Sequence, residues 1–173
     1  MRTFAPVLRK TTKETQLIFS INPFMKRIKE YKKLFKVEQE IDLKELKTTY
    51  RNLVKEWHPD KFQDGDEKAA EAELMSRQII DAYHFLVSIS PETIAANADE
   101  YNTVTAESGI ADYKHKGFTL EISFMDGSTY EYFGVSKDMF TKLNKADKQL
   151  RFAKRNIFNS YLYRRAKRGL EVA

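Results

Sequence analysis

Two long amphipathic segments joined by a short polar stretch constrain the fold of this chain more than any other feature. The larger apolar side chains of both segments recur at the same helical spacing, so each segment presents one apolar face. Two such faces of equal length, joined by about ten polar residues, predict an antiparallel helical hairpin. The apolar residues are Leu43, Leu46, Tyr50, Leu53, Val54 and Trp57 in the first segment and Ala72, Met75, Ile79, Ala82, Tyr83 and Leu86 in the second.

Capping and breaking residues mark the ends of both predicted helices. Asp42 is suited to cap the first helix, because its carboxylate can accept hydrogen bonds from the backbone N–H groups of the first turn. Pro59 ends that helix, since its ring disfavours a helical conformation at His58. Asp66 is expected to cap the second helix, so residues 58–65 form the tip of the hairpin.

The tip contains His58, Pro59 and Asp60 in immediate succession. A catalytic or metal-binding pair is one interpretation, and an ordinary turn is another. A metal site needs a third and usually a fourth ligand, for which the nearby candidates are Asp64 and Asp66. No Gly-rich phosphate cradle or activated serine stands nearby. We therefore expect no catalytic residue, no metal and no cofactor, and we do not expect this chain to be an enzyme.

The charges on the first helix favour a third interpretation, in which the tip is a docking surface. Lys44, Lys47, Arg51 and Lys55 recur at helical spacing, about 120° around the helix from the apolar face. A basic stripe that leads to a rigid corner is typical of a surface that docks on an acidic partner.

Residues from about Tyr31 to Leu86 resemble the J-domain, the module that defines DnaJ-type co-chaperones. The resemblance is carried by YKKLFKV, by LKTTYRNLVKEWHPDK and by IIDAYHFL. It implies docking on the ATPase domain of a DnaK-type heat shock protein 70 chaperone, whose ATP hydrolysis the module stimulates. Lys36 departs from the family pattern, in which Gly is common at this position. The positions that match the family's contact residues are Lys47, Tyr50, Arg51, His58, Pro59 and Asp60.

The balance of charge changes towards the C-terminal end, which indicates a second module. From Tyr113 onward there are 13 Lys or Arg against 6 Asp or Glu, whereas the residues up to Asp112 carry 17 against 19. Such an excess of cations favours an anionic partner, although a solvated face without a partner is the alternative. The segment after Tyr101 is rich in Ala, Thr, Ser and Gly, as is typical of a linker, which we place at 102–112.

The second module has the period of a β-hairpin. FTLEISF alternates apolar and polar side chains, MDGS contains a strong turn signal, and TYEYFGV follows as the partner strand. A two-residue loop would pair Phe124 with Thr129 and expose Tyr130 and Tyr132 as a platform. A three-residue loop with a bulge would pair Phe124 with Tyr130 and bring both tyrosines into the core, because a one-residue shift exchanges the faces of a strand.

Residues 113–165 resemble the KTSC domain, named for the C-terminus of certain lysyl-tRNA synthetases. The resemblance is carried by LEISFMDGSTYEYFGV, by RFAKRNI and by Tyr161. The family has no established activity, and its setting suggests RNA binding. Basic residues neutralise phosphates and aromatic faces stack on unpaired bases, although aromatic residues that pack the sheet are the alternative. The candidate RNA-binding residues are Tyr130, Tyr132, Arg151, Arg155, Arg164 and Arg165.

The sequence therefore predicts an α+β chain, in which a helical J-domain precedes a small domain with an antiparallel β-hairpin or sheet and a helix. The leading function is a co-chaperone of a DnaK-type chaperone, with the C-terminal module targeting it to a client or an RNA. The alternative is an RNA-binding or ribosome-associated protein. We expect a cytoplasmic location and no membrane, because the chain has no cysteine and no apolar run near the ~18 residues that cross a bilayer.

The chain divides into five predicted parts. The N-terminal arm contains TQLIFSI, which is either a strand or a loose segment. The parts are the arm at 1–25, the J-domain at 26–101, the linker at 102–112, the KTSC-like domain at 113–168 and a tail at 169–173.

Overall fold

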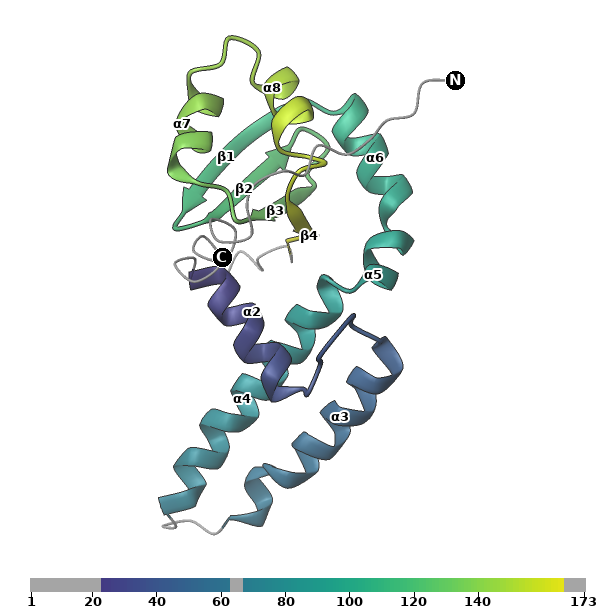
Figure 1. The fold of residues 1–173 in the computed structure, drawn as a ribbon, viewed down its shortest axis with the longest axis vertical. Coiled ribbons are helices and arrows are strands. Elements are labelled where there is room, and N and C mark those ends of the chain that lie inside the picture. Colours follow the sequence, from purple (N-terminus) through teal and green to yellow (C-terminus); the bar gives the residue numbers. More distant parts are fainter. Residues whose placement is uncertain (1–22, 63–66, 167–173) are drawn as a thin grey trace.

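The computed structural model describes residues 23–62 and 67–166, which form a helical body and a second body built on a β-sheet (Figure 1). TQLIFSI and most of the predicted N-terminal arm lie outside the described residues, as do Asp66 and the predicted tail.

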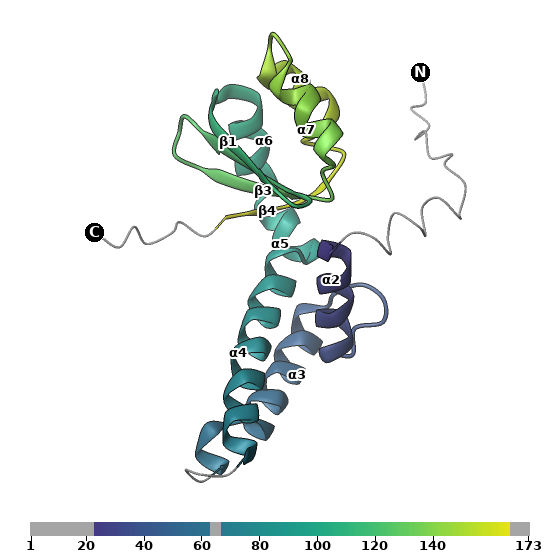
Figure 2. The ribbon, with the colours of Figure 1, turned by 90° about the vertical axis from the view of Figure 1, so that its left-hand side faces the viewer.

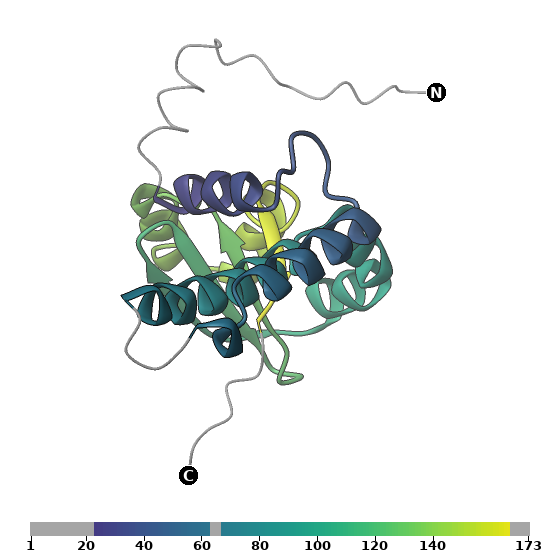
Figure 3. The same cartoon turned by 90° about the horizontal axis from the view of Figure 1, so that it is seen from below.

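The helical body is the antiparallel pair that the apolar spacing predicts. It comprises α2 (Pro23–Leu34), α3 (Leu43–Glu56), a single 3-10 turn (Pro59–Lys61) and α4 (Glu67–Ser88). Helices α3 and α4 run side by side, and α2 lies against the C-terminal half of α4 (Figures 1 and 3). The Asp42 carboxylate accepts hydrogen bonds from the backbone N–H groups of Lys44 and Glu45 at 2.8 and 2.9 Å, which confirms the predicted N-cap of α3. The buried core of this body includes Tyr31, Phe35, Leu46, Ile79, Ala82, Phe85 and Leu86.

Lys36 ends α2 in a left-handed backbone conformation, with φ of 56°. Its N–H donates to the Lys33 carbonyl oxygen at 3.1 Å, and the N–H of Val37 donates to the Lys32 carbonyl oxygen at 2.8 Å. These two bonds form a Schellman motif, in which the residue in the position of Lys36 is usually Gly because a side chain is strained there. The departure from the family pattern at Lys36 therefore has a structural cost.

The stretch predicted as a linker is helix and strand instead. Two helices follow α4, namely α5 (Pro91–Ala96) and α6 (Ala98–Glu107), and the first strand begins at Ile110. On α6, Tyr101, Val104 and Thr105 are buried in the core of the sheet-containing body. Thr103 and Ala106 lie on the exposed side of α6, so the segment has the composition of a linker although the helix is packed.

The second body is a four-stranded antiparallel sheet with the order β1-β2-β3-β4. One face of the sheet is covered by α6 and by two further helices, α7 and α8 (Figure 2). The predicted α+β fold is thus confirmed. Ser136 caps α7, because its hydroxyl oxygen accepts a hydrogen bond from the backbone N–H of Met139 at 3.2 Å. The bounds are β1 (Ile110–Lys116), β2 (Thr119–Phe124), β3 (Thr129–Phe133), α7 (Lys137–Asn144), α8 (Gln149–Asn156) and β4 (Leu162–Arg165).

The β2–β3 register places both central tyrosines in the core. Ile122 pairs with Tyr130 and Leu120 pairs with Tyr132. Phe124 pairs with neither Thr129 nor Tyr130; its N–H donates to the Ser128 carbonyl oxygen at 2.8 Å, across a loop of three residues. Both tyrosines nevertheless lie in the core, as the alternative with a three-residue loop predicted. The prediction of an exposed platform of Tyr130 and Tyr132 is wrong.

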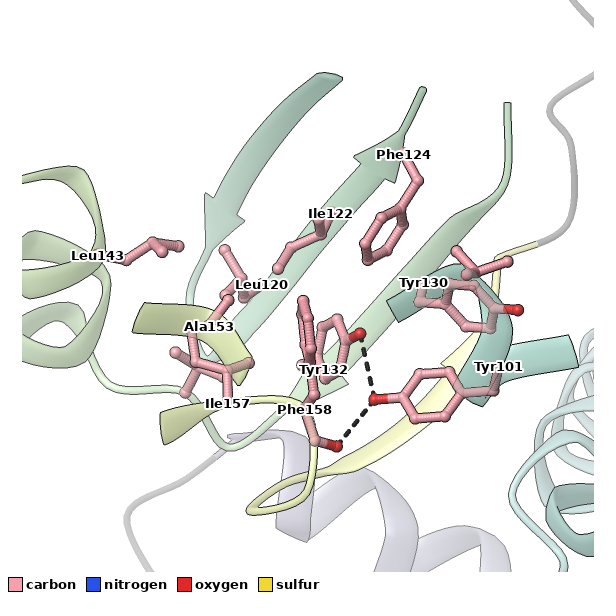
Figure 4. Packing of buried hydrophobic residues seen from close by; sticks show 12 residues of the cluster. Tyr101, Leu120, Ile122, Phe124, Tyr130, Tyr132, Leu143, Ala153, Ile157 and Phe158 are labelled. Atoms are coloured by element: carbon pink, nitrogen blue, oxygen red, sulfur yellow. Dashed lines mark hydrogen bonds between the residues drawn. The ribbon is translucent and has the colours of Figure 1, made fainter. Parts of the chain in front are cut away.

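The tyrosines form a buried hydrogen-bond relay in this core (Figure 4). The Tyr101 hydroxyl donates to the Phe158 carbonyl oxygen at 2.8 Å and lies 3.3 Å from the Tyr132 hydroxyl. A hydroxyl carries one proton, so Tyr132 donates in the second bond. Burial raises the pKa of both Tyr101 and Tyr132, which keeps the two hydroxyls protonated as the relay requires.

Phe133 joins the two bodies. It lies in β3, yet it belongs to the buried core around α2 and α4, with its ring 5.8 Å from the ring of Phe85. The guanidinium of Arg164 lies 5.0 Å from the Phe85 ring and 5.6 Å from the Phe133 ring, and it pairs with Glu131. The sheet is thereby seated at the C-terminal end of α4 (Figure 2).

The conformation of Lys36 predicts that Lys36→Gly stabilises the protein. Glycine removes the strain of a side chain at positive φ, so the free energy of unfolding should rise by about 1 kcal/mol. Urea unfolding would measure the change. The matched control is Lys33→Gly within α2, which should lower the free energy of unfolding by about 1 kcal/mol, and a Lys36→Gly variant no more stable than the parent would contradict the motif.

The buried relay predicts that Tyr101→Phe destabilises the sheet-containing body. The variant leaves the Phe158 carbonyl oxygen without its donor and the Tyr132 hydroxyl without its acceptor, which should cost about 2 kcal/mol. Thermal unfolding followed by tyrosine absorbance would detect the loss. Tyr161→Phe is the control, because no hydrogen bond of its hydroxyl is seen among residues 23–62 and 67–166, and a similar loss in both variants would rule out a special role for Tyr101.

Candidate functional site

The His-Pro-Asp corner projects from the end of α3 furthest from the sheet (Figure 1). The backbone N–H of Asp60 donates to Nδ1 of His58 at 3.3 Å, and the N–H of Lys61 donates to the His58 carbonyl oxygen at 3.0 Å. The side chains of His58 and Asp60 are 48% and 87% exposed, with Nδ1 of His58 3.4 Å from Oδ2 of Asp60. Local hydrogen bonds thus hold the corner in shape while its polar groups remain accessible.

The basic stripe on α3 faces outward. Lys44, Lys47, Arg51 and Lys55 are all exposed. None of the four forms an ion pair with another residue in the described ranges. Their charges are therefore available to a partner, as the helical spacing predicts.

Tyr50 is shared between the core and the surface. It is half-buried, and its ring stacks on that of Tyr83 with the centroids 4.1 Å apart. The stacking fixes the tyrosine against α4, so the edge that remains exposed is held beside Lys47 and Arg51 with little conformational freedom to lose on binding.

The metal-binding interpretation of the corner depends on carboxylates that lie outside the described residues. Across 23–62 and 67–166, no three His, Asp or Glu side chains converge as ligands for a metal ion. The candidate ligands Asp64 and Asp66 lie outside the described residues. No helix in the described ranges is long and apolar enough to cross a membrane.

The candidate RNA-binding residues do not come together. Tyr130 and Tyr132 are 1% and 0% exposed, so neither ring can stack on a base. Arg164 is held between the two bodies by Glu131, Phe85 and Phe133, and only 27% of its side chain is exposed.

The other three arginines of that set fall into two groups. Nη1 of Arg165 lies 2.8 Å from Oε2 of Glu100 on α6, so its charge is already paired. Arg151 and Arg155 are exposed on α8. Lys148, which was not among the candidates, lines the same surface hollow as these two, and its position three and seven residues before them is the signal that would have included it.

A helical hairpin with an accessible His-Pro-Asp corner beside an outward basic helix face defines a protein-docking module. Residues 30–92 match the family model of the DnaJ domain, and residues 107–161 match that of the KTSC domain. The chain is a J-domain protein with a C-terminal KTSC domain, and its DnaJ domain gives it a co-chaperone kind of role towards heat shock protein 70 partners. Searches among curated proteins and among solved structures found no match.

The sheet-containing body extends beyond the KTSC match at both ends. Tyr101 and Val104 of α6 precede residue 107 but are buried in its core, and β4 follows residue 161 and completes the sheet. We therefore treat α6 and β4 as structural parts of this body.

The partly buried position of Arg164 and the exposed position of Arg151 predict that their substitution affects stability differently. Arg164→Gln removes a partly buried ion pair and the contact with two aromatic rings, so the free energy of unfolding should fall by about 1–2 kcal/mol. Arg151→Gln on the exposed side of α8 should change it by less than about 0.5 kcal/mol. Chemical unfolding of both variants would separate the two, and equal effects would show that Arg164 does not hold the bodies together.

Proposed function

We propose that this chain docks on the ATPase domain of a DnaK-type chaperone and stimulates its ATP hydrolysis. The observation that carries the proposal is the exposed His58–Asp60 corner at the end of a helix whose accessible face is basic. The proposal is supported further by the DnaJ match, which contains the whole of this surface.

The residues of the surface have separable tasks in this proposal. Lys47 and Arg51 steer the encounter with an acidic partner, because long-range attraction between exposed charges accelerates association. Asp60 offers its carboxylate oxygens to a cationic group of the chaperone. The 3-10 turn of the corner is already closed by its own hydrogen bonds, so little conformational entropy is lost when the complex forms.

The ATP chemistry belongs to the partner in this proposal, and the chain itself is not an enzyme. The KTSC domain lies at the other end of the molecule from the corner (Figure 1). A client or an RNA on that domain and a chaperone on the corner would not compete for the same surface, which suits a targeting role for the C-terminal part.

The corner predicts that His58→Gln abolishes the stimulation of ATP turnover. The glutamine lacks the ring nitrogen that accepts the hydrogen bond from the backbone N–H of Asp60, so the docked geometry is lost. Because His58 is exposed, the free energy of unfolding should change by less than about 0.5 kcal/mol. Single-turnover ATP hydrolysis by a DnaK-type chaperone, measured with and without the variant, tests this.

His84→Gln is the matched control, since His84 is also exposed but lies near the opposite end of α4. It should stimulate the chaperone as the parent does. Stimulation by His58→Gln at the level of the parent would overturn the proposed function.

A further inference from the structure

The helices α7 and α8 carry a marked excess of positive charge on their exposed sides. Between residues 137 and 155 there are seven Lys or Arg against two Asp, and every one of the nine is exposed. The basic residues are Lys137, Lys142, Lys145, Lys148, Arg151, Lys154 and Arg155.

The apolar sides of α7 and α8 pack against the sheet, so the basic sides point away from it. Leu143, Ala153 and Ile157 are fully buried in the core that both helices cover. Within residues 23–62 and 67–166, none of the seven cations forms an ion pair, whereas Arg164 and Arg165 of the same domain do. The charge of the α7–α8 surface is therefore not neutralised by the protein itself.

A hollow of about 340 Å³ lies along α8 and the two residues that precede it. Three cations line it, namely Lys148, Arg151 and Arg155, together with the half-buried ring of Phe152 and the amide of Asn156. Asp147 also lines it. Cations beside an aromatic ring are the groups that bind a phosphate and the base attached to it.

The α7–α8 surface combines the features that suit a nucleic acid. Interfaces with nucleic acids are polar and positively charged, as this surface is. The half-buried ring of Phe152 lines the hollow beside three cations, where an unpaired base can stack, and a partner bound by charge alone would not need such a ring.

We infer that the α7–α8 surface binds single-stranded RNA, with phosphates on Lys148, Arg151 and Arg155 and a base against Phe152. An unpaired strand is required, because the bases of a duplex are stacked on one another and cannot reach the ring in the hollow. The site differs from the set suggested by the sequence, in that both tyrosines and Arg164 and Arg165 have no part in it. It also lies at the end of the molecule opposite the His-Pro-Asp corner, so it does not depend on the co-chaperone proposal (Figure 2).

Fluorescence anisotropy of the full chain with a labelled twelve-nucleotide oligouridylate tests the inference. With three phosphate contacts, the affinity should fall roughly 20-fold or more between about 50 and 200 mM salt. The triple variant Lys148→Gln, Arg151→Gln, Arg155→Gln should bind at least about 10-fold more weakly at low salt, and its slope of log affinity against log salt should be shallower by about 2. Phe152→Leu, which keeps an apolar side chain in the core, should lose about 5-fold or more.

The control is a second triple variant with the same change in net charge, Lys26→Gln, Lys33→Gln, Lys116→Gln, whose residues are exposed outside α7 and α8. It should keep the parent affinity within about twofold. Equal losses in the two triple variants would show an effect of net charge alone and overturn the site. Equal affinity for an RNA duplex would overturn the role of Phe152, and tighter binding of a polyglutamate peptide of matched charge would assign the surface to an acidic protein instead.

Discussion

The packing of α3 against α4 is the interaction on which the functional surface depends. Helical segments of this length gain most of their stability from an apolar seam, not from intrinsic propensity. Leu46 from one helix and Ile79 and Leu86 from the other are buried in that seam. Because the seam uses the apolar side of α3, the basic side must face solvent, and because the helices are antiparallel, the connection between them must project. The packing of α3 against α4 therefore determines both the exposed basic stripe and the projecting His-Pro-Asp corner.

Local signals made the helical body predictable, whereas the details of the sheet required the structure. Asp42 is a capping residue and Pro59 a helix breaker, and both act within about one turn, so the two ends of α3 could be located from the sequence. The placement of Tyr130 and Tyr132 depended on the loop after Phe124, where a shift of one residue reverses the faces. The strands β1 and β4 lie at the sheet edges and carry a mixed pattern of burial, and β4 pairs with β3 only across the intervening helices α7 and α8.

The candidate RNA-binding residues show a further limit of sequence patterns. Arg164 and Arg151 cannot be distinguished from the sequence, because both are arginines in the same basic segment. Their difference arises from Glu131 and Phe85, which lie 33 and 79 residues away along the chain from Arg164. Whether a cation is paired inside the fold or offered to a partner is decided by such distant neighbours, and no local periodicity contains that information.

Phe133 couples the stability of the two bodies. Its ring comes from the sheet but is buried in the helical core, 5.8 Å from the ring of Phe85. Unfolding of the sheet would therefore open a cavity in the core around α2 and α4, so damage to the C-terminal domain would also weaken the helical body that carries the corner.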